Sequence, residues 1–456
     1  MFSRTLKLLL IGSLALTLPA CGDDEPPPAD NTGAACDIEK QSGCEEGLAC
    51  EKLSDDTYGC FAPVNVRGNV FDMVDNGPVS GARVVARDAN DTPVSGVVVT
   101  DADGNYELQV PVTRDANGNP VGGQAALTLR ADATGYLTYP KAPRLPIAVD
   151  VSEPNAEGIV QTASTDIGLL PLQDATGMGS VSGKVLSDSP AGTLVVAGGS
   201  TGVADRDGSY SVFNVPAGSV SVSGYKVGMN IESKTANVSA DADTGGVDLN
   251  VLGNPATRVS GKVEIVNPGN GSDTSVILAL EDTFDANAAR GEAPPGLRVG
   301  NVSGEWAIDG VPDGKYVILA AFENDFLTRD PSNIGGTDIV HITVPADAVV
   351  DQSFKVTGSL DDPSPTGEQV VSGTPEFTWQ DDSSEDHYEI RVFDAYGTKM
   401  WEKLDVPGES GNNPVVSYAG PALQAGMLYQ FRAVSIHKTQ GPISQTEDLM
   451  GTFLYR

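Results

Sequence analysis

The stretch TDADGNYELQVP, Thr100–Pro111, decides the fold of this 456-residue chain. In its second half, Tyr106, Leu108 and Val110 alternate with polar residues, which is the pattern of a half-buried β-strand. Its first half places aspartates before Gly104. This is typical of the tight turn of a β-hairpin, where aspartate bonds to its own backbone and glycine supplies a positive φ. The stretch therefore predicts a hairpin with Tyr106 facing a core.

A calcium loop is the alternative interpretation of the same aspartates. A loop of the helix-loop-helix type needs a glycine at its sixth position and a glutamate at its twelfth. Counted from Asp101, the glycine is fourth and the twelfth residue is Val112. We therefore predict the hairpin turn, with a weak calcium site as the alternative.

The sequence pattern of this stretch occurs three times along the chain, as an internal repeat. The aspartate doublets Asp101/Asp103 and Asp205/Asp207 occur in the first two copies, but the third copy reads Asn301-Val302-Ser303. All three copies instead share a glycine, one further residue and an aromatic: Gly104 and Tyr106, Gly208 and Tyr210, Gly304 and Trp306. We expect each glycine to form the turn and each aromatic to cap a core.

The whole chain after its first residues follows a strand period, and no long helical period interrupts it. The 52 glycines and 30 prolines suit many short strands joined by turns. We predict an all-β fold, with tandem β-sandwich domains after a small disulfide-rich module. The expected boundaries are a lipoprotein signal peptide at 1–20, a lipidated cysteine and proline-rich tether at 21–35, the disulfide-rich module at 36–61, three related sandwiches at 62–171, 177–253 and 255–357, and a fourth sandwich at 364–456.

The N-terminus has the features of an export signal. Arg4 and Lys7 precede the apolar run Leu8–Leu18, which is too short for a membrane span. The closing residues LPAC, Leu18–Cys21, resemble the lipobox of bacterial lipoproteins. That resemblance implies that Cys21 becomes the lipid-carrying N-terminus, and Gly22 in place of aspartate favours the outer membrane. An ordinary signal peptide that ends near a cysteine is the alternative.

Four further cysteines lie close together in the sequence. In an exported chain they predict two disulfides that hold a module too small for a core of its own. A four-cysteine zinc site is the alternative, although none of the spacings forms the C-x-x-C pair typical of such sites. The sequence leaves all three pairings open for Cys36, Cys44, Cys50 and Cys60.

The first repeat resembles a known family. The segments GNVFD, GPVSGARVVARD, TDADGNYELQVP and LTLRADATGY are similar to the carboxypeptidase regulatory-like domain, and the second and third repeats are similar more loosely. This resemblance implies a transthyretin-like β-sandwich that is a non-catalytic accessory. The zinc peptidases that carry such domains need histidine and glutamate ligands, whereas the histidines here, His341, His387 and His437, are scattered.

The last hundred residues follow a different plan. Leu423, Gly426, Tyr429 and Phe431 have the spacing of the tyrosine corner, and residues 364–456 resemble a fibronectin type III sandwich. The resemblance implies that the hydroxyl of Tyr429 bonds to the backbone a few residues upstream.

The charge of the chain limits its partners. The formal net charge is −34, and loss of Arg4 and Lys7 with the signal makes it −36. Such a surface repels phosphate backbones, so we expect no nucleic-acid partner. We also expect no cofactor and no metal.

A few stretches of the sequence have residues in common with enzyme motifs. Gly198–Gly202, GGSTG, has the spacing of a nucleophile elbow around Ser200, but the elbow needs a following helix and the sequence continues as a strand. The acidic pairs Asp381/Asp382 and Glu385/Asp386 fit a solvated loop better than acid–base chemistry. His387 fits a strand edge, and Trp401 fits a core residue better than a sugar-stacking platform.

These observations predict a non-catalytic, lipid-anchored surface protein. We expect a string of β-sandwiches that acts as a structural or adhesive spacer, with the membrane as partner through its anchor and a surface protein or glycan at the fourth sandwich. The alternative is a carbohydrate- or calcium-binding accessory module of a secreted enzyme or surface complex.

Overall fold

The structure is a computed structural model of the chain. It describes residues 36–456, apart from 39, 89, 122–126, 256, 267–271, 287–289, 322–325, 329–337, 409–410 and 448. The predicted signal peptide, the lipidation site Cys21 and the tether lie outside the described residues. Over the described residues the fold is all β, with two short 3₁₀ helices, η1 (Ala163–Thr165) and η2 (Glu281–Thr283), as its only helical turns. No helix in this part of the chain is long and apolar enough to cross a membrane.

The cysteine module, residues 36–61, is a small hairpin that docks on the first sandwich. Its strands β1 (Ala49–Lys52) and β2 (Tyr58–Phe61) pair antiparallel, with Cys50 opposite Cys60. Glu51, fully buried, pairs with Arg114, whose guanidinium also donates to the carbonyl of Ala62 at 2.7 Å. The module is therefore fixed to the body by a buried ion pair as well as by the chain.

The first unit, residues 62–171, is a sandwich of two four-stranded sheets. Its apolar core includes Val66, Tyr106, Leu108 and Leu129. One sheet has the order β10-β3-β6, with β9 also on β3, and the other has the order β5-β4-β7-β8. The strands are β3 (Val64–Asp72), β4 (Arg83–Arg87), β5 (Val98–Val99), β6 (Asn105–Val110), β7 (Leu127–Asp132), β8 (Ala148–Val149), β9 (Ile159–Val160) and β10 (Ile167–Leu169).

The second unit, residues 177–253, has its strands joined into a single sheet. Pairing of β16 with β19 joins its two halves into one nine-stranded sheet, which closes over a core of its own. The strands are β11 (Met178–Leu186), β12 (Leu194–Ala197), β13 (Ser200–Val203), β14 (Ser209–Pro216), β15 (Gly218–Lys226), β16 (Met229–Ile231), β17 (Lys234–Val238), β18 (Asp243–Thr244) and β19 (Leu249–Gly253).

The third unit, residues 255–357, again has two four-stranded sheets, in the orders β23-β20-β27-β25 and β22-β21-β24-β26. Strand β21 is buried along its whole length, because one face meets the core and the other meets a second apolar cluster. The strands are β20 (Val259–Ile265), β21 (Thr274–Leu280), β22 (Arg298–Val302), β23 (Glu305–Ile308), β24 (Gly314–Ala320), β25 (Leu327–Thr328), β26 (Val340–Val344) and β27 (Val349–Gly358).

The fourth unit, residues 364–456, packs a six-stranded sheet against the two-stranded sheet β29-β32. Aromatic rings fill the space between them, with Phe377 4.8 Å from Phe431 and Trp379 5.4 Å from Tyr388 between ring centroids. The strands are β28 (Gln369–Val371), β29 (Glu376–Thr378), β30 (His387–Asp394), β31 (Lys399–Pro407), β32 (Val415–Ser417), β33 (Leu428–His437), β34 (Gly441–Gln445) and β35 (Thr452–Tyr455).

The three repeats share a contact that the sequence pattern only half reveals. In each repeat the signature aromatic lies directly across the ladder from a glycine of the first strand: Tyr106 opposite Gly68, Tyr210 opposite Gly183, and Trp306 opposite Gly261. The hydroxyl of Tyr106 donates to the carbonyl of Thr165 at 2.5 Å, and that of Tyr210 donates to the carbonyl of Val247. Each tyrosine thus connects its hairpin, through a hydrogen bond, to a later segment of the chain that passes over the first strand of the unit.

The turns before these aromatics are of two kinds. Gly104 and Gly208 adopt the expected positive φ, 79° and 84°. The third copy departs from the prediction, because Gly304 is not among the positive-φ glycines. The positive φ of this segment, 55°, belongs to Asn301, which lies inside β22 where the register between β21 and β22 shifts, as in a β-bulge.

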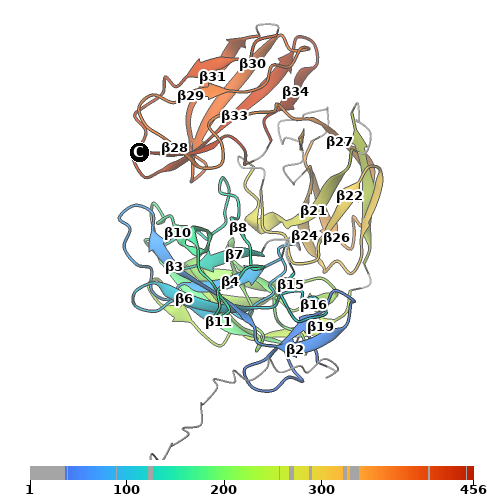
Figure 1. Ribbon diagram of the computed structural model, residues 1–456. Helices are drawn as coiled ribbons and strands as arrows, with labels where there is room; N and C mark the ends of the chain where they lie inside the picture. The colour runs from blue at the N-terminus through green and yellow to red at the C-terminus, as the bar shows by residue number, and fades with distance from the viewer. Residues whose placement is uncertain are drawn as a thin grey trace, which may run out of the picture.

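The four units pack around a common centre instead of forming the predicted string (Figure 1). Hydrogen bonds join each neighbouring pair, and the chain closes on itself because the hydroxyl of Tyr396 in the fourth unit donates at 2.6 Å to the carbonyl of Pro171 at the end of the first. Other inter-unit bonds run from Asn214 Nδ2 to the Tyr136 carbonyl (2.8 Å), from the Gly228 amide to the Gly310 carbonyl (2.8 Å) and from the Phe326 amide to Glu447 Oε1 (2.7 Å).

Candidate functional site

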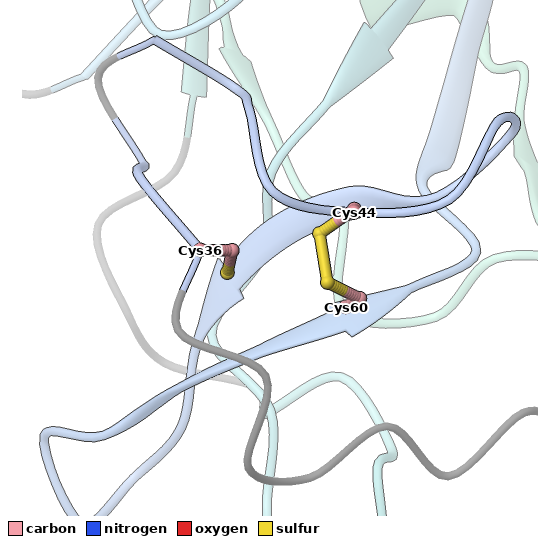
Figure 2. Close-up of side chains that lie close together, drawn as sticks. All are labelled: Cys36, Cys44 and Cys60. Carbon is pink, nitrogen blue, oxygen red and sulfur yellow. A yellow bond between two sulfur atoms is a disulfide. The ribbon is translucent and has the colours of Figure 1, made fainter.

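The four cysteines of the module form two disulfides, Cys36–Cys50 and Cys44–Cys60. The sulfur atoms of Cys36, Cys44 and Cys60 lie within 4.8 Å of one another, and Figure 2 shows the bond between the last two. Zinc binds thiolates, and a disulfide sulfur is not a thiolate. The observed pairing therefore selects one of the three connectivities and opposes the zinc alternative.

The aspartates of the repeat turns are occupied by protein donors. Asp101 Oδ1 accepts from the amides of Asp103 at 2.9 Å and Asn105 at 2.8 Å, and the Asn105 amide is the main cause that lowers the pKa of Asp101. Asp207 accepts from the Ser209 amide and from Lys184 Nζ, each at 2.9 Å. Within the described residues the three cysteines form the only cluster of potential metal ligands. The arrangement is that of turns in which the carboxylate serves the backbone.

We predict that calcium leaves the stability of the protein unchanged. The backbone amides already satisfy the Asp101 carboxylate, so a cation would have to displace them. The measurement is the melting temperature of the mature chain in 1 mM calcium and in excess chelator, with magnesium as the control. A rise of several degrees in calcium alone would establish the calcium site instead.

The remaining candidates from the sequence lie apart from one another. Ser200 begins strand β13 and its hydroxyl donates to the carbonyl of Asn214 at 2.7 Å, so it is not on a strand-to-helix elbow. His341 lies 2.7 Å from Glu281, His387 lies 3.1 Å from Asp386 and His437 contacts Thr439 at 3.3 Å. No two of these histidines share a partner in these contacts.

The acidic loop and Trp401 have structural partners. Asp381 accepts from the Tyr388 hydroxyl at 2.9 Å, and Asp382 accepts from the Ser435 hydroxyl at 2.8 Å. Trp401 is half-buried, with its ring centroid 5.3 Å from that of Tyr418. These contacts serve the fourth unit. The two aspartates are half-buried and bonded to side chains, whereas the sequence predicts a solvated loop, and Trp401 packs at the margin of the core and not inside it.

The tyrosine corner has the predicted geometry. The hydroxyl of Tyr429 accepts from the amide of Gln424 at 2.8 Å, and Gly426 between them takes a φ of +83°. Leu423 is half-buried against the core of the same unit. This contact fixes the loop that leads into β33.

The outer face of β4 and β7 is the unexpected feature of the first unit. Alternate residues of these strands face the core, so Val85, Arg87, Thr128, Arg130 and Asp132 face away from it. In a free sandwich such a face is open to water. Here Arg87 is 7% exposed, Arg130 1% and Asp132 6%, and Arg130 contacts Thr201 of the second unit and Glu292 of the third.

Arg130 is the centre of a buried ionic network between three units. Its Nε and Nη2 donate to Asp132 at 2.8 and 3.0 Å, its Nη1 donates to both oxygens of Glu292 at 3.0 and 2.9 Å, and its Nη2 also donates to Thr201 Oγ1 at 2.8 Å. All five donors of the guanidinium are thereby used. Burial alone would lower the pKa of Arg130, but the two carboxylates outweigh it and raise this pKa, so the side chain stays charged.

A cavity of about 630 Å³ lies beside this network, at the junction of the four units. Its walls include Thr128 of the first unit, Phe213 of the second, Glu292 of the third and Leu449 of the fourth. Small-molecule sites commonly have volumes of about 300–1,000 Å³ and occur at domain interfaces. The junction is therefore the candidate functional site of this protein.

The charge of the cavity differs from that of the chain. Its lining contains five basic and four acidic residues, namely Arg87, Lys141, Arg144, Arg290, Arg298, Asp88, Asp91, Asp285 and Glu292. The whole chain has 28 basic and 62 acidic residues. The lining of the junction is thus close to neutral in a strongly acidic protein.

Of the lining residues, the sequence singles out only those of the GGSTG segment as a candidate site, and Gly198, Gly199, Ser200 and Thr201 of that segment line the cavity. The alternation of β7 correctly puts Arg130 and Asp132 on the polar face, but it cannot tell a polar face that meets water from one that meets another unit. The sequence feature that could have indicated this network is the pair Arg130 and Asp132. Their opposite charges lie on the same face of β7, which suits a buried ionic network.

No family model and no curated protein matches this sequence. Among solved structures the chain is similar to BcpA, the major pilin subunit of Bacillus cereus, with 11% identity over 65% of this chain and 99% of that one and a TM-score of 0.16. A streptococcal ancillary pilin shows 12% identity over 64% and 98%, with a TM-score of 0.17. A DUF3823 family protein from Bacteroides uniformis shows 14% identity over 44% and 100%, with a TM-score of 0.19. At these scores the assignment of fold and function rests on the chain itself.

Proposed function

We propose that this protein is an exported, lipid-anchored and non-catalytic structural protein of the bacterial cell surface or outer membrane. The observation that carries the proposal is the cysteine module, whose two disulfides stand directly after the LPAC sequence and the proline-rich tether. Disulfides persist in oxidising compartments, and acyl chains on an N-terminal cysteine hold a protein to a membrane.

The packing of the units determines the shape that such a protein would present at the cell surface. A string of sandwiches would act as a flexible spacer, whereas units that bond to one another around a centre act as a single head. The tether of residues 22–35 then sets the distance of that head from the lipid, at roughly 3 Å per residue where it is extended. In this proposal the fourth unit, which resembles a fibronectin type III sandwich, offers its loops to a surface protein or a glycan.

The anchor is tested by changing Cys21. We expect Cys21→Ser to abolish incorporation of labelled palmitate and to move the protein from the membrane fraction to the soluble fraction, because the lipidated sulfur is lost. The double change Cys44→Ser with Cys60→Ser is the control, since it removes two cysteines but leaves the LPAC sequence intact and should keep the label. Persistent labelling and membrane association of the Cys21→Ser protein would overturn the proposed anchor.

The adhesive role is tested separately. Affinity capture with the head from a cell-surface extract of its host should retain one saturable protein or glycan, and changes in the loops of the fourth unit should release it. Absence of any saturable partner would leave the head as a structural spacer only.

A further inference from the structure

We propose that the cavity at the junction of the four units binds a small organic acid with an apolar body. This inference goes beyond the anchored structural role and does not depend on it. It rests on two residues of the cavity wall that each carry a buried polar atom without a partner, on the balanced charge of the lining and on its apolar walls.

Arg87 supplies the first polar atom. The side chain is 7% exposed and lines the cavity, and its Nη1 lies 3.3 Å from Asp91. Its Nε is buried and has no hydrogen-bond partner among the described residues. A buried N–H without a partner is destabilising, so such a donor in a cavity wall indicates an acceptor supplied by a ligand or by water.

Thr128 supplies the second polar atom. It lies directly opposite Arg87 in the β4–β7 ladder, so both side chains leave the same face of the sheet side by side. Its Oγ1 is also buried without a partner among the residues that the structure describes. Arg87 and Thr128 are thus neighbours in the cavity wall, and each carries a polar atom without a partner.

The chemistry of these two donors selects an acid group. A guanidinium forms its strongest hydrogen bonds with carboxylates, through paired N–H groups in a plane, and a hydroxyl can donate to the same anion. The basic and acidic residues of the lining are nearly balanced, so the cavity does not repel an anion as the acidic surface of the rest of the chain does. A neutral or cationic ligand would not form such charge-assisted hydrogen bonds with a guanidinium.

The remainder of the wall is suited to an apolar body. Leu145, Pro146, Phe213, Pro216 and Leu449 line the cavity. Tyr136 lines it as well, and its hydroxyl donates to Asp72 Oδ2 at 3.1 Å. Burial and that carboxylate raise the pKa of Tyr136 to about 12, so this hydroxyl stays protonated and adds no negative charge.

The experiment is a calorimetric titration of the full mature chain, residues 21–456 with Cys21→Ser, which needs no detergent. The probes are decanoate and 4-phenylbutyrate, with 1-decanol and decyltrimethylammonium as neutral and cationic counterparts. We expect saturable binding of at least one acid, one molecule per chain, and at least tenfold weaker binding of the neutral and cationic probes.

Variants assign the binding to the junction. Arg87→Met should weaken acid binding about tenfold or more, because it removes the buried donor, and Thr128→Val should weaken it several-fold. Arg67→Met is the matched control, since Arg67 pairs with Glu107 on the exposed face of the other sheet and should leave binding unchanged. If Arg87→Met does not fold, Thr128→Val decides, because it keeps the shape of the side chain.

Three results would overturn the proposal. The first is that neither acid binds saturably, and the second is that 1-decanol binds as tightly as decanoate. The third is that a folded Arg87→Met or Thr128→Val protein binds the acids as tightly as the unchanged chain.

Discussion

Arg130→Met is expected to lower the free energy of unfolding by about 3–5 kcal/mol, because it leaves the buried carboxylate of Asp132 and the half-buried carboxylate of Glu292 without their cation. The guanidinium is 1% exposed and uses every donor on these two residues and Thr201. Methionine fills much of the same volume, so the loss reports charge and hydrogen bonding more than a cavity. The measurement is the urea midpoint of the mature chain, followed by tryptophan fluorescence.

The matched control and a partial rescue follow from the same network. Arg258→Met should cost less than about 1 kcal/mol, because Arg258 and Asp309 form an exposed pair with side chains 62% and 72% accessible. Adding Glu292→Gln to Arg130→Met should recover part of the loss, because one of the two uncompensated charges is then removed. Equal effects of Arg130→Met and Arg258→Met would show that the junction is open to water.

The network also predicts the direction of a pH effect. Burial alone would raise the pKa of Glu292, but Arg130 outweighs it, and the pKa lies below its ordinary value of 4.5. A carboxyl whose pKa falls on folding stabilises the folded state above its unfolded pKa, and that contribution is lost as the pH falls through the folded pKa. The contacts between the units should therefore weaken in acid below about pH 4.5, and less so in Glu292→Gln.

Gly183→Ala is expected to destabilise the second unit by about 3 kcal/mol or more, although it adds a single methyl group. A Cβ at this position would lie 2.2 Å from the carbonyl oxygen of Val247 and 2.5 Å from its carbon, and both are backbone atoms. The same carbonyl accepts the hydroxyl of Tyr210. The added methyl group must therefore push the returning segment away and break the tyrosine contact with it.

Gly253→Ala is the control for this steric effect. Gly253 lies in β19 of the same unit, and a Cβ there would meet nothing within 4 Å. Its replacement should change the free energy of unfolding by about 0.5 kcal/mol or less. A Gly183→Ala protein as stable as Gly253→Ala would mean that the returning segment does not cross β11 at this glycine.

The elements that depend on neighbouring residues could be predicted from the sequence. The alternation of Tyr106, Leu108 and Val110 gives the burial of β6, and the glycines at 104 and 208 give its turn and that of β14. The spacing of Leu423, Gly426 and Tyr429 gives the hydroxyl contact with the backbone. In each case the residues that decide the geometry lie within a few positions of one another.

The contacts between distant segments could not be predicted in this way. Glu292 lies 162 residues from Arg130, and the 28 basic residues of the chain offered no reason to choose this pair. A period of two residues tells which face of β7 is polar, but not that another unit covers it. For the same reason the sequence suggested a string of sandwiches, and the cavity at their junction was missed.

The third repeat shows a further limit. The repeat predicts that Gly304 takes a positive φ, because the glycine at that place does so in the other two copies. Gly304 does not, and the positive φ of this segment lies at Asn301 inside β22, where the register between β21 and β22 shifts. The pattern therefore predicts the hairpin but not the backbone conformation of its turn.

The central claim is that the four units form one compact head, and small-angle X-ray scattering of residues 36–456 tests it most directly. A compact chain of this length has a radius of gyration of about 22 Å. The packing described here predicts a value near this, with a single-peaked distribution of interatomic distances. A radius far above it, with a distance distribution that extends over four units end to end, would contradict the account and restore the string.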